Sequence, residues 1–112
     1  MMKKTKAADL GQGIAAANEV KLAHYATLLK RFAGNDTRMQ RARLAAALQH
    51  APVTTYDARK YLDIYDVPAR CTELRACGLH IVTFRVSQQT DAGVIHRRIG
   101  LYVLKSEGVL ND

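Results

Sequence analysis

The chain has 112 residues, of which 48% are hydrophobic and 24% charged, which is typical of one compact domain and excludes a wholly disordered chain. No apolar run approaches the ~20 residues that span a bilayer, and no apolar segment follows the basic start to form a signal peptide, so we expect a cytoplasmic protein. Lys and Arg (17) outnumber Asp and Glu (10), for a net charge of +7, a balance typical of small nucleic-acid-binding domains.

The first 36 residues divide into a tail and a helix. Residues 1–17 show little periodicity and include Lys3, Lys4 and Lys6, which predicts a mobile basic tail. From Asn18 onward apolar residues recur at helical spacing, which predicts an amphipathic helix over 18–33 and a hinge at 34–36. Its apolar stripe comprises Leu22, Tyr25, Ala26, Leu29, Phe32 and Ala33. Because an isolated helix of this length is marginal, the stripe must pack on the chain's own core or on a second copy.

Two further helices are expected before residue 63. Thr37 with Gln40 fits a capping box, and strong helix formers continue to His50, where Pro52 follows the helix end. Residues 53–54 are a short extended link, and Thr55 is expected to cap a helix that runs to about residue 62. The inward residues should be Ala58, Tyr61 and Leu62, whereas Asp57, Arg59 and Lys60 should face outward.

A third helix is expected over 67–77. Its start has two alternatives: Asp66 is a good N-cap, but Pro68 disfavours helical geometry at Val67, so Pro68 as the first helical residue is equally plausible. Val67, Cys71 and Leu74 fall on one face, and Gly78 is a typical left-handed helix end.

Beyond Gly78 the hydrophobic period changes from 3.6 to 2. Residues 80–86 are rich in β-branched and aromatic side chains, 87–93 form a polar turn, and 94–104 alternate again. This pattern predicts a β-hairpin, followed by a tail over 105–112. The alternate apolar positions of the second strand are Ile95, Ile99, Leu101 and Val103.

This order of elements is that of a winged helix-turn-helix. The segments Arg41–Leu48, Pro52–Thr55, Ala69–Gly78 and Leu101–Leu104 resemble the small helix-turn-helix domains of bacteriophages and prophages. The most specific parts are the Ala-Arg-x-x-Glu-Leu-Arg-x-x-Gly pattern at 69–78 and the closing Leu-Tyr-Val-Leu strand. The resemblance covers about two-thirds of the chain, and implies a mainly α domain over 37–104, with three helices and a two-stranded wing, that binds DNA. The N-terminal helix and its hinge, over 18–36, precede this domain.

A recognition helix places its outward face in the major groove of DNA. With Cys71 and Leu74 inward, that face is Ala69, Thr72, Glu73 and Ala76, flanked by Arg70 and Arg75. Arg70 either binds guanine through two hydrogen bonds, worth ~1–3 kcal/mol of discrimination, or forms a surface ion pair with Glu73. Arg75 is expected to have a structural or phosphate-binding role.

The wing of a winged helix lies along the DNA backbone or the minor groove, so the basic residues outside the recognition helix are candidates for DNA contacts, mainly to phosphates. Arg97 and Arg98 point to opposite faces of their strand, so we expect one rather than both to reach phosphates. Arg38 lies near a helix N-terminus, where amides bind phosphate, although a solvated face explains Arg38, Arg41 and Arg43 equally well.

The sequence contains no motif typical of an enzyme or a cofactor site, so we expect neither an enzymatic activity nor a bound cofactor. Cys71 and Cys77 on one helix would lie ~9 Å apart, too far for a disulfide. Together with His80 and His96 they have the wrong spacing for zinc, so we expect reduced thiols and no metal. Tyr56, Tyr61 and Tyr65 are expected to be packing residues.

The sequence thus predicts a non-enzymatic regulator that binds double-stranded DNA, with no membrane or small-molecule partner. Because one recognition helix spans few base pairs and the domain closes its core without residues 18–33, we predict a homodimer through Leu22, Tyr25, Leu29 and Phe32. The alternative is a protein-interaction module with incidental basic charge, and a third hypothesis is an accessory subunit of a phage enzyme.

Overall fold

The computed structural model describes residues 18–105, so the predicted tail over 1–17 and all but Lys105 of the C-terminal tail lie outside the described residues. The N-terminal helix covers 18–31 within the described part. It is followed by α2 (Thr37–His50), β1 (Val53–Thr54), α3 (Thr55–Tyr61), α4 (Val67–Ala76), β2 (Ile81–Gln89) and β3 (Ile95–Leu104). No helix among the described residues is long and apolar enough to cross a membrane.

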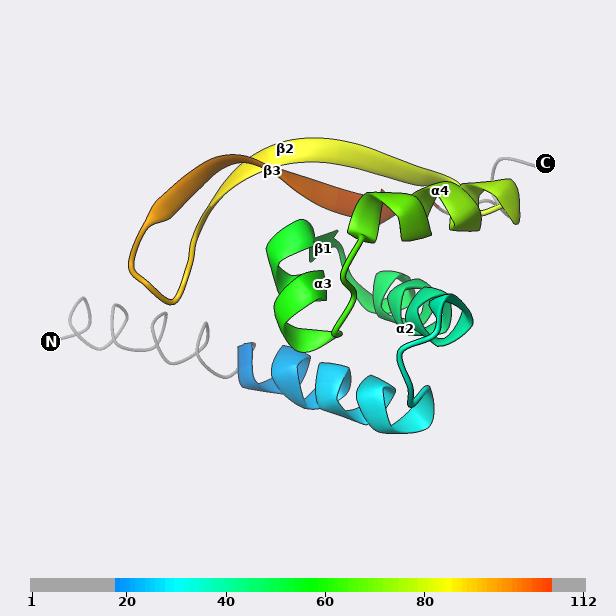
Figure 1. Cartoon of the computed structure of the whole chain (residues 1–112). Helices are drawn as coiled ribbons and strands as arrows, with labels where there is room; N and C mark the ends of the chain where they lie inside the picture. Colours follow the sequence, from blue (N-terminus) through cyan, green and yellow to red (C-terminus); the bar gives the residue numbers. More distant parts are fainter. Residues whose placement is uncertain (1–17, 106–112) are drawn as a thin grey trace, which may run out of the picture.

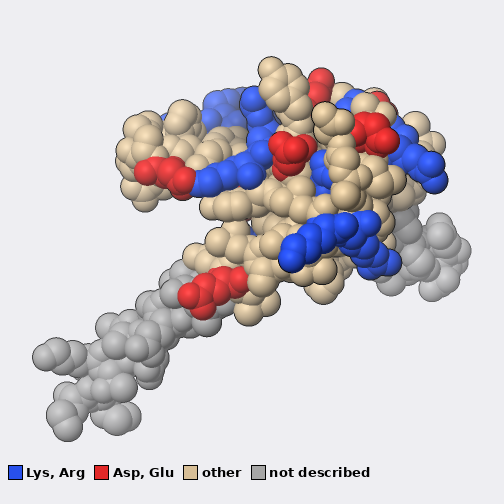
Figure 2. Space-filling view, turned by 60° about the horizontal axis from the view of Figure 1, so that its bottom comes forward, with Lys and Arg blue, Asp and Glu red and all other residues tan. Residues whose placement is uncertain are grey.

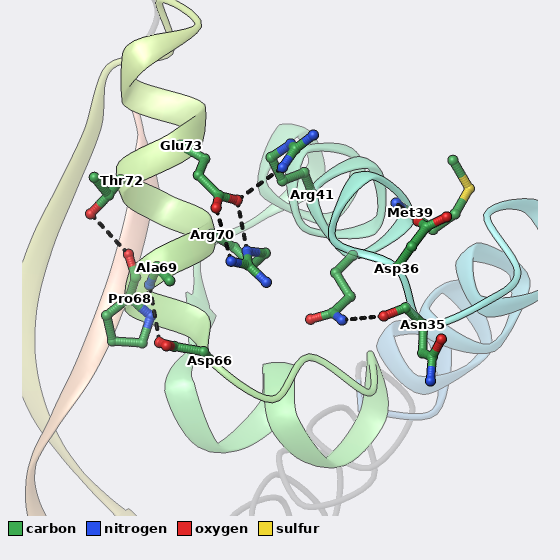
Figure 3. A network of polar contacts seen from close by, with 11 residues as sticks. Asn35, Asp36, Met39, Arg41, Asp66, Pro68, Ala69, Arg70, Thr72 and Glu73 are labelled. Atoms are coloured by element: carbon green, nitrogen blue, oxygen red, sulfur yellow. Dashed lines mark hydrogen bonds and ion pairs between the residues drawn. The ribbon is translucent and has the colours of Figure 1, made fainter.

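The start of each labelled helix is fixed by a side-chain cap. Asp36 caps α2 by accepting a hydrogen bond from the amide of Met39 at 2.8 Å, so the predicted Thr37 cap is wrong by one residue. Thr54 caps α3 through the amide of Asp57 at 3.0 Å, whereas Thr55 was expected to do so. The Asp66 cap of α4 is confirmed (Figure 3). In both corrected cases a suitable oxygen lies one residue earlier, where the backbone is already extended.

The strands form a three-stranded antiparallel sheet in the order β1-β3-β2. The predicted two-stranded wing is therefore incomplete, because Val53 pairs with Tyr102 and adds β1 to the sheet. Strand β2 extends to Gln89, so the turn occupies 90–94 rather than 87–93. We call β2, β3 and this turn the wing. In Figure 1 the helices lie on one side of the wing, which curves over α3.

The core lies where α2, α3 and α4 meet the sheet. Its apolar members include Leu44, Leu62, Val67 and Cys71, all fully buried, as the expected inward faces of α3 and α4 require. Arg43 is also buried, which the sequence did not predict. Its guanidinium donates to four backbone carbonyls, those of Phe32, Gly34, Leu62 and Asp63, and so ties the N-terminal segment to the turn before α4.

The N-terminal helix packs on this core. Tyr25 is 3% exposed, and its ring stacks on that of Tyr61 with centroids 6.2 Å apart. Leu28, absent from the predicted stripe, is buried, and Phe32 is half-buried against the core. Leu22 and Leu29 remain exposed. The buried face is therefore rotated from the expected one, and only part of the predicted stripe is left for a second copy.

Candidate nucleic-acid interface

Helix α4 presents a face of small and polar side chains. Thr72 and Ala76 are exposed, and Ala69 is half-buried. The Thr72 hydroxyl donates to the carbonyl of Pro68 at 3.1 Å, a local bond that the hydroxyl can exchange for an external acceptor. The helix ends as predicted, with Gly78 at a φ of +104°, a conformation that glycine adopts without strain.

Arg70 and Glu73 form a bidentate ion pair on the side of α4 that faces α2. The Arg70 Nε and Nη2 atoms lie 2.7 and 2.9 Å from the two Glu73 oxygens. Arg41 of α2 donates to the same carboxylate at 3.0 Å, as Figure 3 shows. These hydrogen bonds, from Arg70 first and Arg41 second, lower the pKa of Glu73. Because the Arg70 side chain is only 12% exposed, the structure shows the ion-pair alternative for this residue.

The other two predicted arginines of the helical part differ in their surroundings. Arg75 donates to the carbonyl of Ile81 at 2.9 Å and to the hydroxyl of Thr83 at 3.0 Å, which fastens α4 to the start of β2. Arg38 is exposed in the first turn of α2. Arg75 therefore has a structural role, whereas the guanidinium of Arg38 faces solvent.

A basic groove of about 820 Å³ lies between α3, the start of α4 and the inner face of the wing. Helix α3 contributes Thr55 and Tyr56, and the floor includes Gly100 and Tyr102 of β3. A Cβ atom on Gly100 would lie 3.0 Å from the Thr55 hydroxyl, so α3 approaches β3 closely only because residue 100 is glycine. The basic residues that line the groove are Arg59, Lys60, Arg85, His96 and Arg98.

The sequence did not single out Arg59, Lys60 or Arg85, because no local pattern brings α3 beside β2. On the side of the molecule shown in Figure 2, Lys and Arg form separate groups with Asp and Glu between them. Within residues 18–105, no continuous basic stripe crosses this side of the molecule.

An irregularity in β3 positions one of these basic side chains. Val86 pairs with Ile99 and Gln88 with His96, so Arg97 and Arg98 together oppose the single residue Ser87. Such a bulge bends a strand and redirects its side chains. Arg98 has a φ of +61°, which is unfavourable for a residue with a Cβ. Arg98 lines the groove and Arg97 does not.

The tip of the wing is fastened to α3. The Tyr56 hydroxyl accepts from the amide of Asp91 at 3.2 Å, and the Asp91 carboxylate pairs with Lys60. Further in, Gln88 donates to Asp57 at 3.0 Å, and Lys21 of the N-terminal helix donates to the other oxygen of that carboxylate at 3.2 Å. Asp57 is buried, so the expectation that it faces outward is wrong, because the wing and the N-terminal helix both cover it.

Tyr65 is the most exposed of the aromatic residues expected to be packing residues. It is 83% exposed in the turn before α4, and the Arg59 guanidinium lies 5.6 Å from its ring centroid. The packing role expected for Tyr65 is therefore wrong. The ring and its stacked cation lie instead beside the start of the candidate recognition helix.

The two cysteines are free thiols in different surroundings. Cys71 is buried and Cys77 exposed. Burial raises the pKa of Cys71 to about 11, so its thiol is protonated at neutral pH and acts as a core side chain. Within residues 18–105 no group of three or more His, Cys, Asp or Glu side chains is arranged to hold a metal ion.

Comparison with known proteins gives one finding. No curated protein and no solved structure shows significant similarity to the chain. A family model described as a winged helix-turn-helix domain matches residues 39–107, a range that includes α3, α4 and the wing. Domains of this kind generally bind DNA and are typically not enzymes. Since the match spans more than half of the sequence and coincides with the fold described above, the chain belongs to the winged helix-turn-helix domain family.

Proposed function

We propose that this protein is a regulator of the phage or prophage type that binds double-stranded DNA at specific sequences. The observation that carries the proposal is the position of the exposed face of α4 beside the basic groove under the wing. A major groove about 12 Å wide admits a helix, and the small Ala69 and Ala76 side chains allow close approach. Phosphates beside the inserted helix then meet the cations of the groove.

The contacts divide by type. We assign Thr72 to a base edge, because its hydroxyl is exposed on α4, and Arg38 and Arg98 to phosphates. Arg70 contacts guanine only if that base replaces the Glu73 carboxylate as its bidentate partner, so we assign it first to positioning α4 against α2. Arg97, which does not line the groove, contributes general positive charge.

The experiment is selection of bound fragments from random duplex DNA, followed by affinity measurements at two salt concentrations. Thr72→Val removes the hydroxyl at constant shape, and should weaken binding to the selected site more than to random DNA, because base contacts carry the specificity. Arg98→Asn should weaken both alike. Failure of the wild-type protein to bind any duplex at low salt would contradict the proposal.

Arg70→Ala separates the two roles of that residue. A positioning role predicts a loss of stability together with a uniform loss of DNA affinity. A guanine contact predicts a loss of ~1–3 kcal/mol confined to the selected site.

The protein-interaction module is kept as the second candidate because apolar side chains remain exposed on the N-terminal helix. They are Val20, Leu22 and Leu29. A homodimer through this helix now depends on Leu22 and Leu29, since Tyr25 and Phe32 pack on the chain's own core. Binding to a partner protein without any affinity for duplex DNA would favour this second function.

A further inference from the structure

The face of the wing that points away from the helices is apolar. Cross-strand partners lie on the same face of a sheet, and three alternate pairs of the ladder share this outer face. These pairs are Val82 with Val103, Phe84 with Leu101, and Val86 with Ile99. The inner face is identified by Ile81 and Tyr102, which are buried in the core. We call the six residues of the three pairs the outer face.

The outer face inverts the usual arrangement of an antiparallel sheet. A sheet with one side in water normally turns its polar residues outward. Here the inner positions after Ile81 are Thr83 and Arg85, whereas the outer positions are all apolar. Phe84 is 47% exposed, and the other five are half-buried. In Figure 1 no helix lies on this side of the wing, so no described element covers it.

We propose that a second copy of this chain covers the outer face, the two wings stacking face to face. A contact between two copies places identical patches against one another, and the +7 chain repels itself wherever the patches are basic. The outer face has no charged side chain among its six, so two copies meet there without opposing like charges. Stacking also leaves α4 and most of the groove lining exposed in both copies, because Ile99 is the one outer-face residue that also lines the groove.

Face-to-face stacking is favoured over pairing of the β2 edges. Arg75 already donates to the carbonyl of Ile81 and to the side chain of Thr83, and Arg85 carries a charge in the middle of the strand. Charged residues on an edge strand oppose pairing with another edge.

The size of the outer face sets the expected affinity of the dimer. Its three pairs span ~13 Å along the strands, and such a patch is smaller than the ~800 Å² per partner of a stable complex. We therefore expect a dimer that dissociates in the micromolar range. This interface differs from the predicted N-terminal one, and does not depend on the DNA-binding proposal.

The test is sedimentation equilibrium of the full chain over a wide range of concentration. Phe84→Thr with Val86→Thr makes the outer face polar without changing the net charge, and both replacements favour strands. The dimer dissociation constant should rise at least tenfold, which corresponds to about 1.4 kcal/mol. The matched control, Leu22→Gln with Leu29→Gln, alters the exposed face of the N-terminal helix and should leave the dissociation constant unchanged.

Circular dichroism of both double variants checks that each is folded. If the outer-face double variant is unfolded, the single variant Phe84→Thr replaces it in the sedimentation measurement. A wild-type protein that is monomeric at the highest concentration overturns the proposal. Loss of the dimer in the helix variant alone also overturns it, and assigns the interface to Leu22 and Leu29. Duplex DNA binding by a monomeric wild type would leave the proposed function standing while this inference fails.

Discussion

The two faces of the wing are built from alternate residues of the same strands, yet they differ in charge and polarity. The inner face carries Arg85, Arg98 and Gly100 and forms the groove with α3, whereas the outer face carries three apolar cross-strand pairs. Alternation of apolar and polar residues predicts a strand with two different faces, but it does not say which face meets the helices. In this chain the inner face is apolar at Ile81 and Tyr102, which enter the core, and basic further along, at Arg85 and Arg98.

The inner face is a groove rather than a core because of what lies at its floor. Gly100 has no side chain, and the Thr55 hydroxyl lies 3.3 Å from that of Tyr102. Beyond this point the wing arches over α3, and its basic side chains line the groove between them. The same curvature brings Asp91 to Lys60. The groove and the attachment of the wing tip therefore arise from one bend.

The largest effect is expected at the floor of the groove. In Gly100→Val the new side chain would begin 3.0 Å from the Thr55 hydroxyl and 3.1 Å from the Tyr102 hydroxyl, so α3 must move away from β3. Overpacking of this kind lowers the free energy of unfolding by ~1–3 kcal/mol. Urea denaturation followed by circular dichroism measures it.

The outer-face substitution Phe84→Thr is the control for that measurement, since exposed positions change stability by only ~0.5 kcal/mol. Equal losses in the two variants would show that the two faces contribute alike to the fold.

The next effect separates two neighbouring arginines. Arg98→Asn removes the charge that lines the groove and keeps a residue that tolerates positive φ. The slope of log affinity against log salt should become shallower by ~0.9, as for one phosphate contact. Arg97→Asn, one residue away and outside the groove, should leave the slope unchanged. Indistinguishable slopes for the two variants would show that the bulge does not select between them.

Most of the fold was predictable from local patterns. The bounds of α2 and α4, the Asp66 cap and the left-handed Gly78 follow from residues that are neighbours in sequence. The two caps placed one residue late, at Thr37 and Thr55, show the usual limit of such reasoning, because consecutive polar residues compete for the same role.

The remaining differences depend on contacts between distant segments. Burial of Arg43 requires carbonyls from two loops, and burial of Asp57 requires both Lys21 and Gln88. The groove likewise needs α3 and β2, which are separated by the whole of α4. The predicted interface residues on α4 lie on one helix as expected, whereas the groove cations could be found only from the folded chain.

The smallest effect concerns the end of the groove. Asp91 neutralises Lys60 in the free protein, so a phosphate must displace this carboxylate. Asp91→Asn should therefore strengthen binding to duplex DNA at low salt, by no more than about fivefold, because exposed ion pairs contribute ~0–1 kcal/mol. Glu19→Gln makes the same change in net charge on the N-terminal helix and should give a smaller gain.

In a Lys60→Gln background, Asp91→Asn should give no gain beyond that of the Glu19 control. A gain that persists without Lys60 would mean that Asp91 acts only through the overall charge of the wing.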